Sequence, residues 1–292
     1  MKYIKLTYTL QFKETPIWGN PPSFVFRSIL GSSLRRLTCI LHQQKSCADC
    51  MVKSSCVYSV FFETNIDKDL TSLEGRNKGA HPFVMEVNHI DDRTAVIEVL
   101  FIGRAINYIP YINIALENAG TNGVGRNRAC YTICGIIAGD DLFEFNQIEE
   151  KCLNWPVENI SNRYVSSIIL ETPCRIKKEG HYISEIQFDD LLKSINKRMQ
   201  ILMELFSEEK FLPSADFEAS IRNEAKNQRW VEQSYYSGRQ KTVMKLGGVI
   251  GLIEMQAEVP ESIVQYINAM ELFHVGKNIS FGLGKIKVVY DV

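Results

Sequence analysis

Near the end of the chain lies a glycine-rich stretch, Gly276-Lys277-Asn278-Ile279-Ser280-Phe281-Gly282-Leu283-Gly284-Lys285-Ile286-Lys287. Glycine permits bends and close approaches that other residues do not, and backbone N–H groups beside lysine are typical of phosphate-binding loops. The spacing matches neither a P-loop, which ends in Gly-Lys-Ser/Thr, nor a dinucleotide-binding fingerprint. An ordinary turn with solvated lysines explains the same residues, so the stretch indicates phosphate binding only with support from elsewhere in the chain.

That support is a second copy of the pattern in the first half of the chain. The hexapeptide Gly123-Val124-Gly125-Arg126-Asn127-Arg128 matches Gly282-Leu283-Gly284-Lys285-Ile286-Lys287 as Gly-x-Gly-basic-x-basic. Each hexapeptide lies between a predicted helix and a predicted strand. The match therefore indicates an internal duplication in which each half carries the same loop.

The first half is predicted to run strand, helix, strand, strand, helix, strand. Strands are expected at 3–12, 83–88, 94–102 and 129–137, and helices from Pro22 and Pro110, where proline suits a first turn. The first helix should present an apolar stripe made of Phe26, Leu30, Leu34, Leu37 and Leu41. The second should end just before Gly120, and residues 39–80 should form an irregular insertion.

The second half is predicted to repeat this order. We expect a strand at 164–171, a small hairpin at 174–183, a helix capped by Asp189 or Asp190, strands at 240–246 and 249–257 joined by a turn at Gly247-Gly248, a helix from Pro260 to Gly276 and a strand at 285–291. Residues 207–230 fit no element clearly. The order predicts an α+β protein of two tandem ferredoxin-like (RRM-like) βαββαβ domains, with boundaries 1–160 and 161–292.

Composition limits the classes of protein and partner. The chain has 292 residues, 45% of them hydrophobic, and a net charge of −1, so any polyanion must bind to a local basic patch. The N-terminus, Met1-Lys2-Tyr3-Ile4-Lys5, lacks the apolar core of a signal peptide, and no apolar run is long enough to span a membrane. We therefore expect a cytoplasmic protein without a membrane partner.

These residues resemble a known family, the CRISPR-associated endoribonucleases that process precursor crRNA, which belong to the RAMP superfamily. The segments that carry the resemblance are Leu272–Lys285, Tyr236–Gln240 with Met244–Gly248, and Thr172–Arg175 in the second half, and Leu30–Leu37, Cys47–Tyr58 and His81-Pro82-Phe83 in the first. The resemblance covers most of the chain.

The resemblance implies binding of CRISPR repeat RNA and one metal-independent cut, in which a ribose 2′-hydroxyl attacks its own phosphate and leaves a 2′,3′-cyclic phosphate. Such chemistry needs proton transfers, which suit His, and stabilisation of added negative charge, which suits Lys or Arg. No cofactor is expected for catalysis. Expected partners are repeat RNA or crRNA, with other Cas effector subunits and a second copy of the chain as further candidates.

The RNA backbone should be held by the glycine-rich loops and by basic residues near them. These residues are Gly276, Lys277, Gly282, Gly284, Lys285, Lys287, Gly123, Gly125, Arg126, Arg128, Arg239 and Lys241. Arg239 and Lys241 have even spacing with Lys245, so a strand over 239–245 would place them on one face. A solvated strand face is the alternative.

The resemblance places a catalytic His just after the first helix of the N-terminal domain, where His42 stands, with Tyr58 farther along the chain. His81 is the second candidate, because His81-Pro82 also resembles the family. His274 ends a helix, where a cation is favoured. It is expected to be structural or close to RNA, and His89 and His181 are expected to be solvated.

The insertion holds Cys39, Cys47, Cys50 and Cys56. Thiolates at such spacing can form a tetrahedral site for a structural zinc ion, with an iron–sulfur cluster as second choice. Reduced thiols or a redox pair are the alternatives. Two other functions also remain open: a RAMP subunit that binds crRNA without cutting it, and a zinc-knuckle interaction protein without affinity for RNA.

Overall fold

The computed structural model describes residues 1–41, 46–64, 66, 78–89, 91–156, 164–208, 221–237, 241–255 and 259–290. The chain divides into two compact units. Unit 1 consists of Met1–Leu153 with Ile201–Lys210, and unit 2 of Asn154–Gln200 with Phe211–Val292. Each unit consists of two segments, so no single residue separates them, and the boundary expected at residue 160 stays a prediction.

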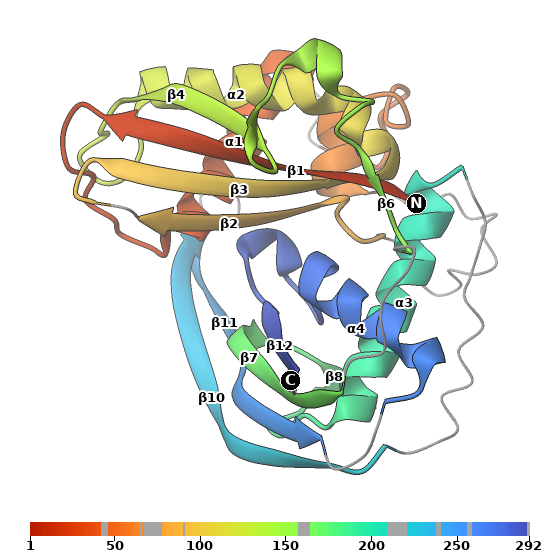
Figure 1. The fold of residues 1–292 in the computed structure, drawn as a ribbon. Helices are drawn as coiled ribbons and strands as arrows, with labels where there is room; N and C mark the ends of the chain where they lie inside the picture. Colours follow the sequence, from red (N-terminus) through yellow and green to blue (C-terminus); the bar gives the residue numbers. More distant parts are fainter. Residues whose placement is uncertain are drawn as a thin grey trace. The chain divides into compact units, whose positions relative to one another are not determined.

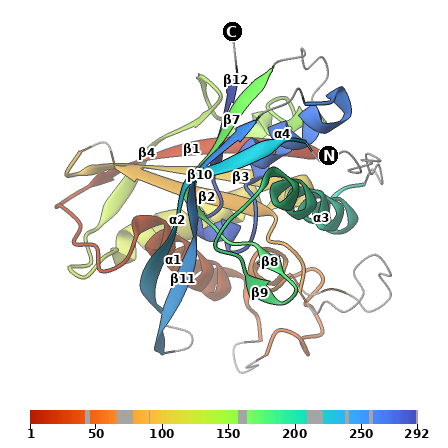
Figure 2. The ribbon, with the colours of Figure 1, turned by 90° about the horizontal axis from the view of Figure 1, so that it is seen from below.

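Unit 1 is built on an antiparallel sheet with the order β2-β3-β1-β4-β5 (Figure 1). Its strands are β1 (Lys2–Phe12), β2 (Phe83–His89), β3 (Thr94–Ile102), β4 (Tyr131–Ala138) and β5 (Asp141–Leu142), and the short β6 (Leu153–Asn154) pairs with β1. The helices α1 (Pro22–Thr38) and α2 (Ile109–Asn122) contact each other, and Figure 2 shows both on one side of these strands. Alternate residues of β1, such as Leu6, Tyr8 and Leu10, are fully buried.

Helix α1 begins at Pro22, as the fixed φ of proline favours. It buries Phe26, Leu30 and Leu34 but ends at Thr38. The expected apolar stripe is wrong beyond that point, since Leu37 is 40% exposed and Leu41 lies outside the helix. The helical spacing of leucines extends in the sequence beyond the end of the helix, so the spacing alone predicted too long a buried stripe.

The insertion after α1 contributes to the core of unit 1. Residues 57–63 are helical, Ser59–Glu63 as a π-helical turn. Phe61 is fully buried, and its ring lies 5.6 Å from that of Phe83 and 6.3 Å from that of Phe101. The expectation of an irregular segment is wrong here, because one helical turn is too short to show a period in the sequence.

A 3-10 turn (Gly103–Tyr108) leads into α2. The helix continues through Gly120, which was expected just beyond its end, to a cap at Gly123. A Cβ at Gly120 would overlap the carbonyl oxygen of Tyr131, so this glycine allows α2 to pack closely on β4. A second 3-10 turn (Phe145–Gln147) precedes β6.

Unit 2 repeats the topology of unit 1. Its sheet has the order β10-β11-β7-β12, built from β7 (Val165–Cys174), β10 (Asn223–Ser237), β11 (Thr242–Met255) and β12 (Ile286–Tyr290). With α3 (Phe188–Phe206) between β7 and β10, and α4 (Glu261–Phe273) between β11 and β12, the order is βαββαβ in both units. The predicted class, two tandem ferredoxin-like domains, is confirmed. A small hairpin, β8 (Lys177–Lys178) and β9 (His181–Tyr182), follows β7.

The hairpin expected at Gly247-Gly248 is wrong. Both glycines lie inside β11, which pairs along its length with β10, a strand over residues that had matched no element. A Cβ at Gly247 would overlap the indole of Trp230, and one at Gly248 would lie 2.7 Å from the carbonyl oxygen of Cys174. These glycines permit close contacts across the sheet and do not form a turn.

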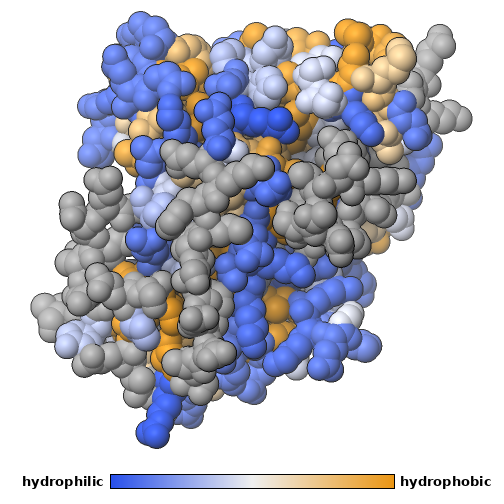
Figure 3. Space-filling model, turned by 90° about the vertical axis from the view of Figure 1, so that its right-hand side faces the viewer, coloured by the Kyte–Doolittle hydropathy of each residue, from blue (hydrophilic) through white to orange (hydrophobic). Residues whose placement is uncertain are grey.

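Helix α3 is amphipathic. It buries Leu192, Ile195 and Met199, while Lys193 and Lys197 are exposed. Figure 3 shows hydrophilic side chains over much of the described surface on the side where α3 lies. No helix within the described ranges is long and apolar enough to cross a membrane.

Cys174, at the end of β7, is fully buried, and this burial raises the pKa of its thiol to about 12. An unfolded thiol loses its proton near pH 8.5, so between these values the folded state binds more protons than the unfolded state. The free energy of unfolding should therefore fall by about 1–1.4 kcal/mol per pH unit above pH 9. Urea titrations at pH 7 and pH 10 measure this slope, which Cys174→Ala should flatten.

The matched control is Cys134→Ala, at an exposed position of unit 1, which should keep the alkaline slope. If Cys174→Ala showed the same slope as the parent protein, the burial of the Cys174 thiol would not be its source.

Candidate nucleic-acid interface and candidate active site

The glycine-rich loop of unit 2 is held by its own backbone bonds. The N–H of Val275 donates to the carbonyl of Gly284 at 2.9 Å, and that of Gly284 donates to the carbonyl of Pro173 at 3.2 Å. The N–H of Lys285 donates to the Thr172 hydroxyl at 2.8 Å. These donors are bonded within the protein. The three residues therefore do not present free backbone N–H groups to a phosphate.

Packing requires the glycines. Gly276 and Gly284 have φ of 95° and 71°, values that side chains disfavour. A Cβ at Gly276 would lie 2.7 Å from the carbonyl oxygen of Arg175, and one at Gly284 would overlap that of Val275. Gly282 also has a positive φ, 79°, in the turn after the 3-10 turn Ile279–Phe281. The glycines therefore shape the loop, and contact with RNA falls mainly to its basic side chains.

The duplicated loops correspond in a different register from the one that the sequence indicated. In unit 1, the N–H of Arg126 donates to the carbonyl of Ile17, just after β1, at 2.8 Å. In unit 2, the N–H of Lys277 donates to the carbonyl of Arg175, just after β7, at 3.0 Å. Each basic residue follows a glycine of positive φ that packs on the same carbonyl. Gly125-Arg126 thus matches Gly276-Lys277, not Gly284-Lys285.

The basic side chains of the loops differ in exposure. Lys277 and Lys287 are exposed, and Lys285 is half-buried with its amine 3.7 Å from Glu171. In unit 1, Arg126 and Arg128 are exposed. They lie on a loop that Asn127 fastens to the turn after β1 by accepting from the N–H of Ile17 at 2.9 Å.

Two further residues were expected on a strand face. Arg239 lies outside the described residues. Lys241 is exposed but stands in the turn before β11, with a φ of 52°, so it does not share a strand face with Lys245. Lys245, in β11, pairs with Glu232 at 3.0 Å.

Beside the loop of unit 2, Lys277 lies in a group with four residues that the sequence did not indicate: Arg175, Lys177, Tyr182 and Trp230. These five residues are called here the Tyr182 patch. Partial burial acts to raise the pKa of Tyr182, but a hydrogen bond with Arg175 and the charges of Arg175, Lys277 and Lys177 lower it overall. Strong positive potential therefore surrounds an exposed aromatic ring. The only signal in the sequence was the interleaving of basic and aromatic residues around 175–182.

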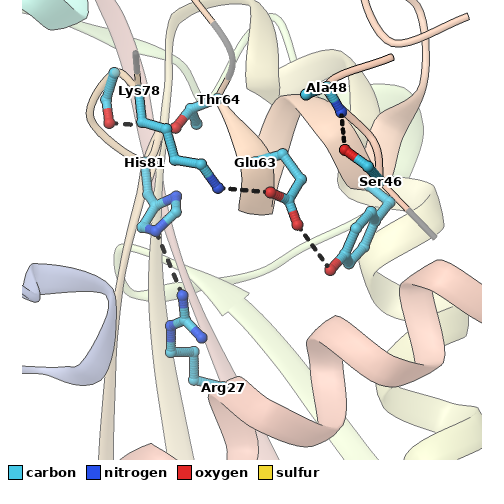
Figure 4. Close-up of polar contacts among 9 residues, drawn as sticks. Arg27, Ser46, Ala48, Glu63, Thr64, Lys78 and His81 are labelled. Atoms are coloured by element: carbon cyan, nitrogen blue, oxygen red, sulfur yellow. Dashed lines mark hydrogen bonds and ion pairs between the residues drawn. The ribbon is translucent and has the colours of Figure 1, made fainter. Parts of the chain in front are cut away.

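In unit 1, His81 meets a cation from α1. The Arg27 guanidinium lies 3.4 Å from Nε2 of His81 (Figure 4). A guanidinium only donates, so a hydrogen bond between the two groups uses Nε2 as the acceptor, with the ring proton on Nδ1. His81 is half-buried, with its ring 5.9 Å from that of Phe83.

Near this pair, the buried carboxylate of Glu63 joins two other side chains (Figure 4). It pairs with the amine of Lys78 at 2.7 Å and accepts from the Tyr58 hydroxyl at 3.4 Å. Lys78 is exposed, whereas Tyr58 is buried and stacks on Phe62, with centroids 5.5 Å apart. Just beyond Glu63, the N–H of Gly79 donates to the carbonyl of Thr64 at 2.8 Å.

Helix α1 presents a stripe of two arginines and a glycine to this helical turn. Arg27 lies 5.3 Å from the centre of the Phe62 ring, and Arg35 lies 5.6 Å from that of Tyr58. Gly31 stands between them, and a Cβ there would lie 3.1 Å from the Phe62 ring. Arg27, Glu63 and Lys78 were not expected at a site, although the spacing of four between Arg27, Gly31 and Arg35 marks one helix face.

The other histidines have different surroundings. His42 lies outside the described residues, and His89 lies in β2. His181 is exposed in β9, with Nδ1 3.1 Å from the carbonyl oxygen of Glu179. His274 is buried, contrary to a role as an open contact for RNA, and its Nδ1 lies 3.1 Å from the carbonyl oxygen of Leu283. It therefore fixes the end of α4 to the glycine-rich loop.

All four cysteines of the insertion are half-buried free thiols. Burial, the charge of Glu63 and the nearby Cys56 and Cys39 raise the pKa of Cys47, so Cys39 and Cys56 lie within electrostatic reach of Cys47. Among the described residues, however, no three His, Cys, Asp or Glu side chains are arranged to hold a metal ion.

Comparison with known protein families accounts for most of the chain. A family described as an N-terminal domain matches residues 1–151. A second, described as CRISPR-associated endoribonuclease Cas6, matches residues 168–286, which include the glycine-rich loop of unit 2. No curated protein sequence matches.

Solved structures share the fold. A product complex of a Thermus thermophilus Cas6 is 13% identical with a TM-score of 0.56, covering 98% of this chain and 99% of that chain. A substrate-mimic complex of another Cas6 is 12% identical with a TM-score of 0.52, covering 99% and 100%. A partial Cas6-RT-Cas1–Cas2 complex contains a chain with a TM-score of 0.51 and 12% identity, covering 100% of this chain but 46% of that one.

The tandem ferredoxin-like domains, each with a basic loop between its last helix and last strand, are the fold of the solved Cas6 structures that this chain resembles. More narrowly, residues 168–286 match the family of CRISPR-associated Cas6 endoribonucleases.

Proposed function

We propose that the protein binds CRISPR repeat RNA and cuts it once without a metal ion, by attack of a ribose 2′-hydroxyl on the adjacent phosphate. The products are a 2′,3′-cyclic phosphate and a 5′-hydroxyl. The match of residues 168–286 to the Cas6 endoribonuclease family carries this proposal, since the matched residues include the basic loop of unit 2.

Each unit offers its own loop cations to RNA. Lys277, Lys287, Arg126 and Arg128 are exposed and free of the packing constraints that fix the glycines. Each cation that contacts phosphate should steepen the salt dependence of binding by about 0.7 in log–log slope for single-stranded RNA. In unit 2, Lys285, Lys241 and Arg239 are assigned to RNA binding with Lys277 and Lys287. Gly276, Gly282 and Gly284 shape the loop of unit 2, and Gly123 and Gly125 shape that of unit 1.

For the cutting step we assign His81 as the base. Its neutral ring is the form that takes a proton from the 2′-hydroxyl, and Arg27 beside it is suited to the charge that develops on the phosphate. Lys78, exposed and aligned by Glu63, is a second cation for that charge. Because the Tyr58 hydroxyl faces Glu63 from a buried position, we assign Tyr58 to positioning. His42 remains the alternative base.

The contact between Arg27 and Nε2 of His81 also supports the rival function, a RAMP subunit that binds crRNA without cutting it. While the guanidinium donates to Nε2, that nitrogen cannot accept a substrate proton. Cleavage therefore requires Arg27 to turn to the phosphate when RNA binds. In the rival function the pair stays closed, and other Cas subunits would be the partners.

The test is incubation of the full chain with end-labelled RNA copies of CRISPR repeats from the source genome, in excess EDTA. One cut, whose 5′ product ends in a cyclic phosphate, supports the proposal. Tight binding without cutting over hours favours the rival function. No binding to any repeat RNA at low salt contradicts both and leaves the interaction protein.

A structural zinc ion on Cys39, Cys47, Cys50 and Cys56 stays a separate prediction. We expect about one zinc per chain after purification without chelator, because zinc binding by the four thiolates would stabilise the folded insertion. Elemental analysis of the parent protein and of Cys47→Ser with Cys50→Ser checks this. Metal well below one ion per chain in both would contradict it.

A further inference from the structure

Unit 2 exposes two aromatic rings side by side. The side chains of Tyr182 and Trp230 are 39% and 41% exposed, and their ring centres lie 6.4 Å apart. Rings of this size usually lie in a core or at an interface, since each buries a large apolar area. Tyr182 comes from the β8–β9 hairpin and Trp230 from β10, so segments far apart in the sequence form this surface.

Cations flank the rings. The guanidinium carbon of Arg175 lies 4.4 Å from the centre of the Tyr182 ring, and the amine of Lys177 lies 4.9 Å from it. Lys277, exposed at the start of the glycine-rich loop, acts electrostatically on the same tyrosine. The rings therefore lie where negative charge is attracted.

The patch is held rigidly. Arg175 is only 7% exposed, its carbonyl accepts from Lys277, and Gly276 packs against its backbone. Its Nε is buried without a hydrogen-bond partner, so one N–H donor of this side chain is not used by the protein. Gly247 leaves room for the Trp230 indole to lie across β11. A platform fixed in this way loses little entropy when a ligand binds.

We propose that the Tyr182 patch is a subsite for one unpaired nucleotide of RNA, with the base on Trp230 and Tyr182 and its phosphate at Lys177 and Lys277. The subsite rests on the proposed function and adds to it a position for single-stranded RNA. Aromatic and guanidinium planes match the open face of an unstacked base, which a paired stem does not offer. An acidic peptide without aromatic side chains would match the cations but has no flat group for the tryptophan.

The probe is a short single-stranded RNA with one 2-aminopurine, whose fluorescence reports stacking. Trp230→Leu should weaken binding about 5- to 150-fold and abolish the fluorescence change, while Trp230→Phe, which keeps a π-face, should stay within about 3-fold. Lys177→Gln should lower the log–log salt slope by about 0.7. Tyr164→Leu is the matched control, because Tyr164 is 59% exposed just before the other end of β7.

Unchanged binding by Trp230→Leu would overturn the subsite. So would an acidic peptide that binds the parent protein as tightly as the RNA does and is equally sensitive to Trp230→Leu. If Trp230→Leu fails to fold, three other results test the subsite: a 2-aminopurine fluorescence change with the parent protein, a smaller change with Lys177→Gln and a retained change with Trp230→Phe. Absence of the change in the parent protein would overturn the subsite.

The two proposals fail separately. If repeat RNA is cut but Trp230→Leu changes neither binding nor fluorescence, the subsite is wrong and the proposed function stands. If no repeat RNA is cut but the 2-aminopurine strand binds through Trp230, the cutting function is wrong and the subsite stands.

Discussion

Gly284→Ala is expected to destabilise unit 2 by about 3 kcal/mol or more, because it combines backbone strain with overpacking. Gly284 has a φ of 71°, and its Cβ would overlap the carbonyl oxygen of Val275. The same residue links the end of α4 to the end of β7 through two backbone bonds. Urea titration followed by circular dichroism should show the loss, and repeat RNA should bind more weakly, because Lys277 follows that junction.

The control for this substitution is Gly180→Ala. Gly180 also has a positive φ, 84°, but nothing lies within 4 Å of the position of its Cβ. Only the strain remains there, so a loss of about 1 kcal/mol is expected. Equal losses at both positions would show that the contact between Gly284 and Val275 does not constrain the loop.

His81→Ala is expected to slow cutting of repeat RNA by about 10²- to 10⁴-fold, the usual contribution of one general acid–base group. The affinity for repeat RNA should change by less than about 3-fold, since the loop cations lie elsewhere in the sequence. Single-turnover cleavage with saturating protein separates the two quantities. Arg27→Lys should also slow cutting, because an ammonium does not reproduce the fork of a guanidinium.

The matching variant is His42→Ala, made in the same background. If His42→Ala abolishes cutting and His81→Ala does not, then His42 is the base, and the contact between Arg27 and His81 is structural.

The fold was predictable because its signals are local. Alternation along residues 3–12, prolines at Pro22 and Pro110 and the repeated order of elements define βαββαβ twice, and the class follows. Gly247-Gly248 was misleading, since glycine marks both turns and close contacts, and only the position of Trp230 distinguishes the two. The predicted correspondence between the two duplicated loops was wrong for a similar reason. The pattern Gly-x-Gly-basic occurs at overlapping positions, and the carbonyl that each glycine meets decides which positions correspond.

The candidate sites depend more on contacts between distant segments. Arg27 and His81, like Tyr182 and Trp230, are each far apart in sequence, so no local pattern joins them. Glu63 shows the same limit. A glutamate in an insertion is normally a solvated residue, and only burial against Tyr58 and Lys78 gives it another role. Exposed basic residues at the loops, in contrast, could be found by composition alone.

The pairing of Thr64 with Gly79 has a consequence for how this family can change over time. Two bonds, from the Gly79 N–H to the Thr64 carbonyl at 2.8 Å and from the Thr64 hydroxyl to the Gly79 carbonyl at 3.2 Å, bring the two residues together. The two ends of this segment are therefore held next to each other. Lengthening a loop with joined ends adds only about 0.6 kcal/mol per doubling of its length. Evolution, or an engineer inserting a reporter domain, can therefore vary the length between Thr64 and Gly79 without changing the strand register of β2 and β3.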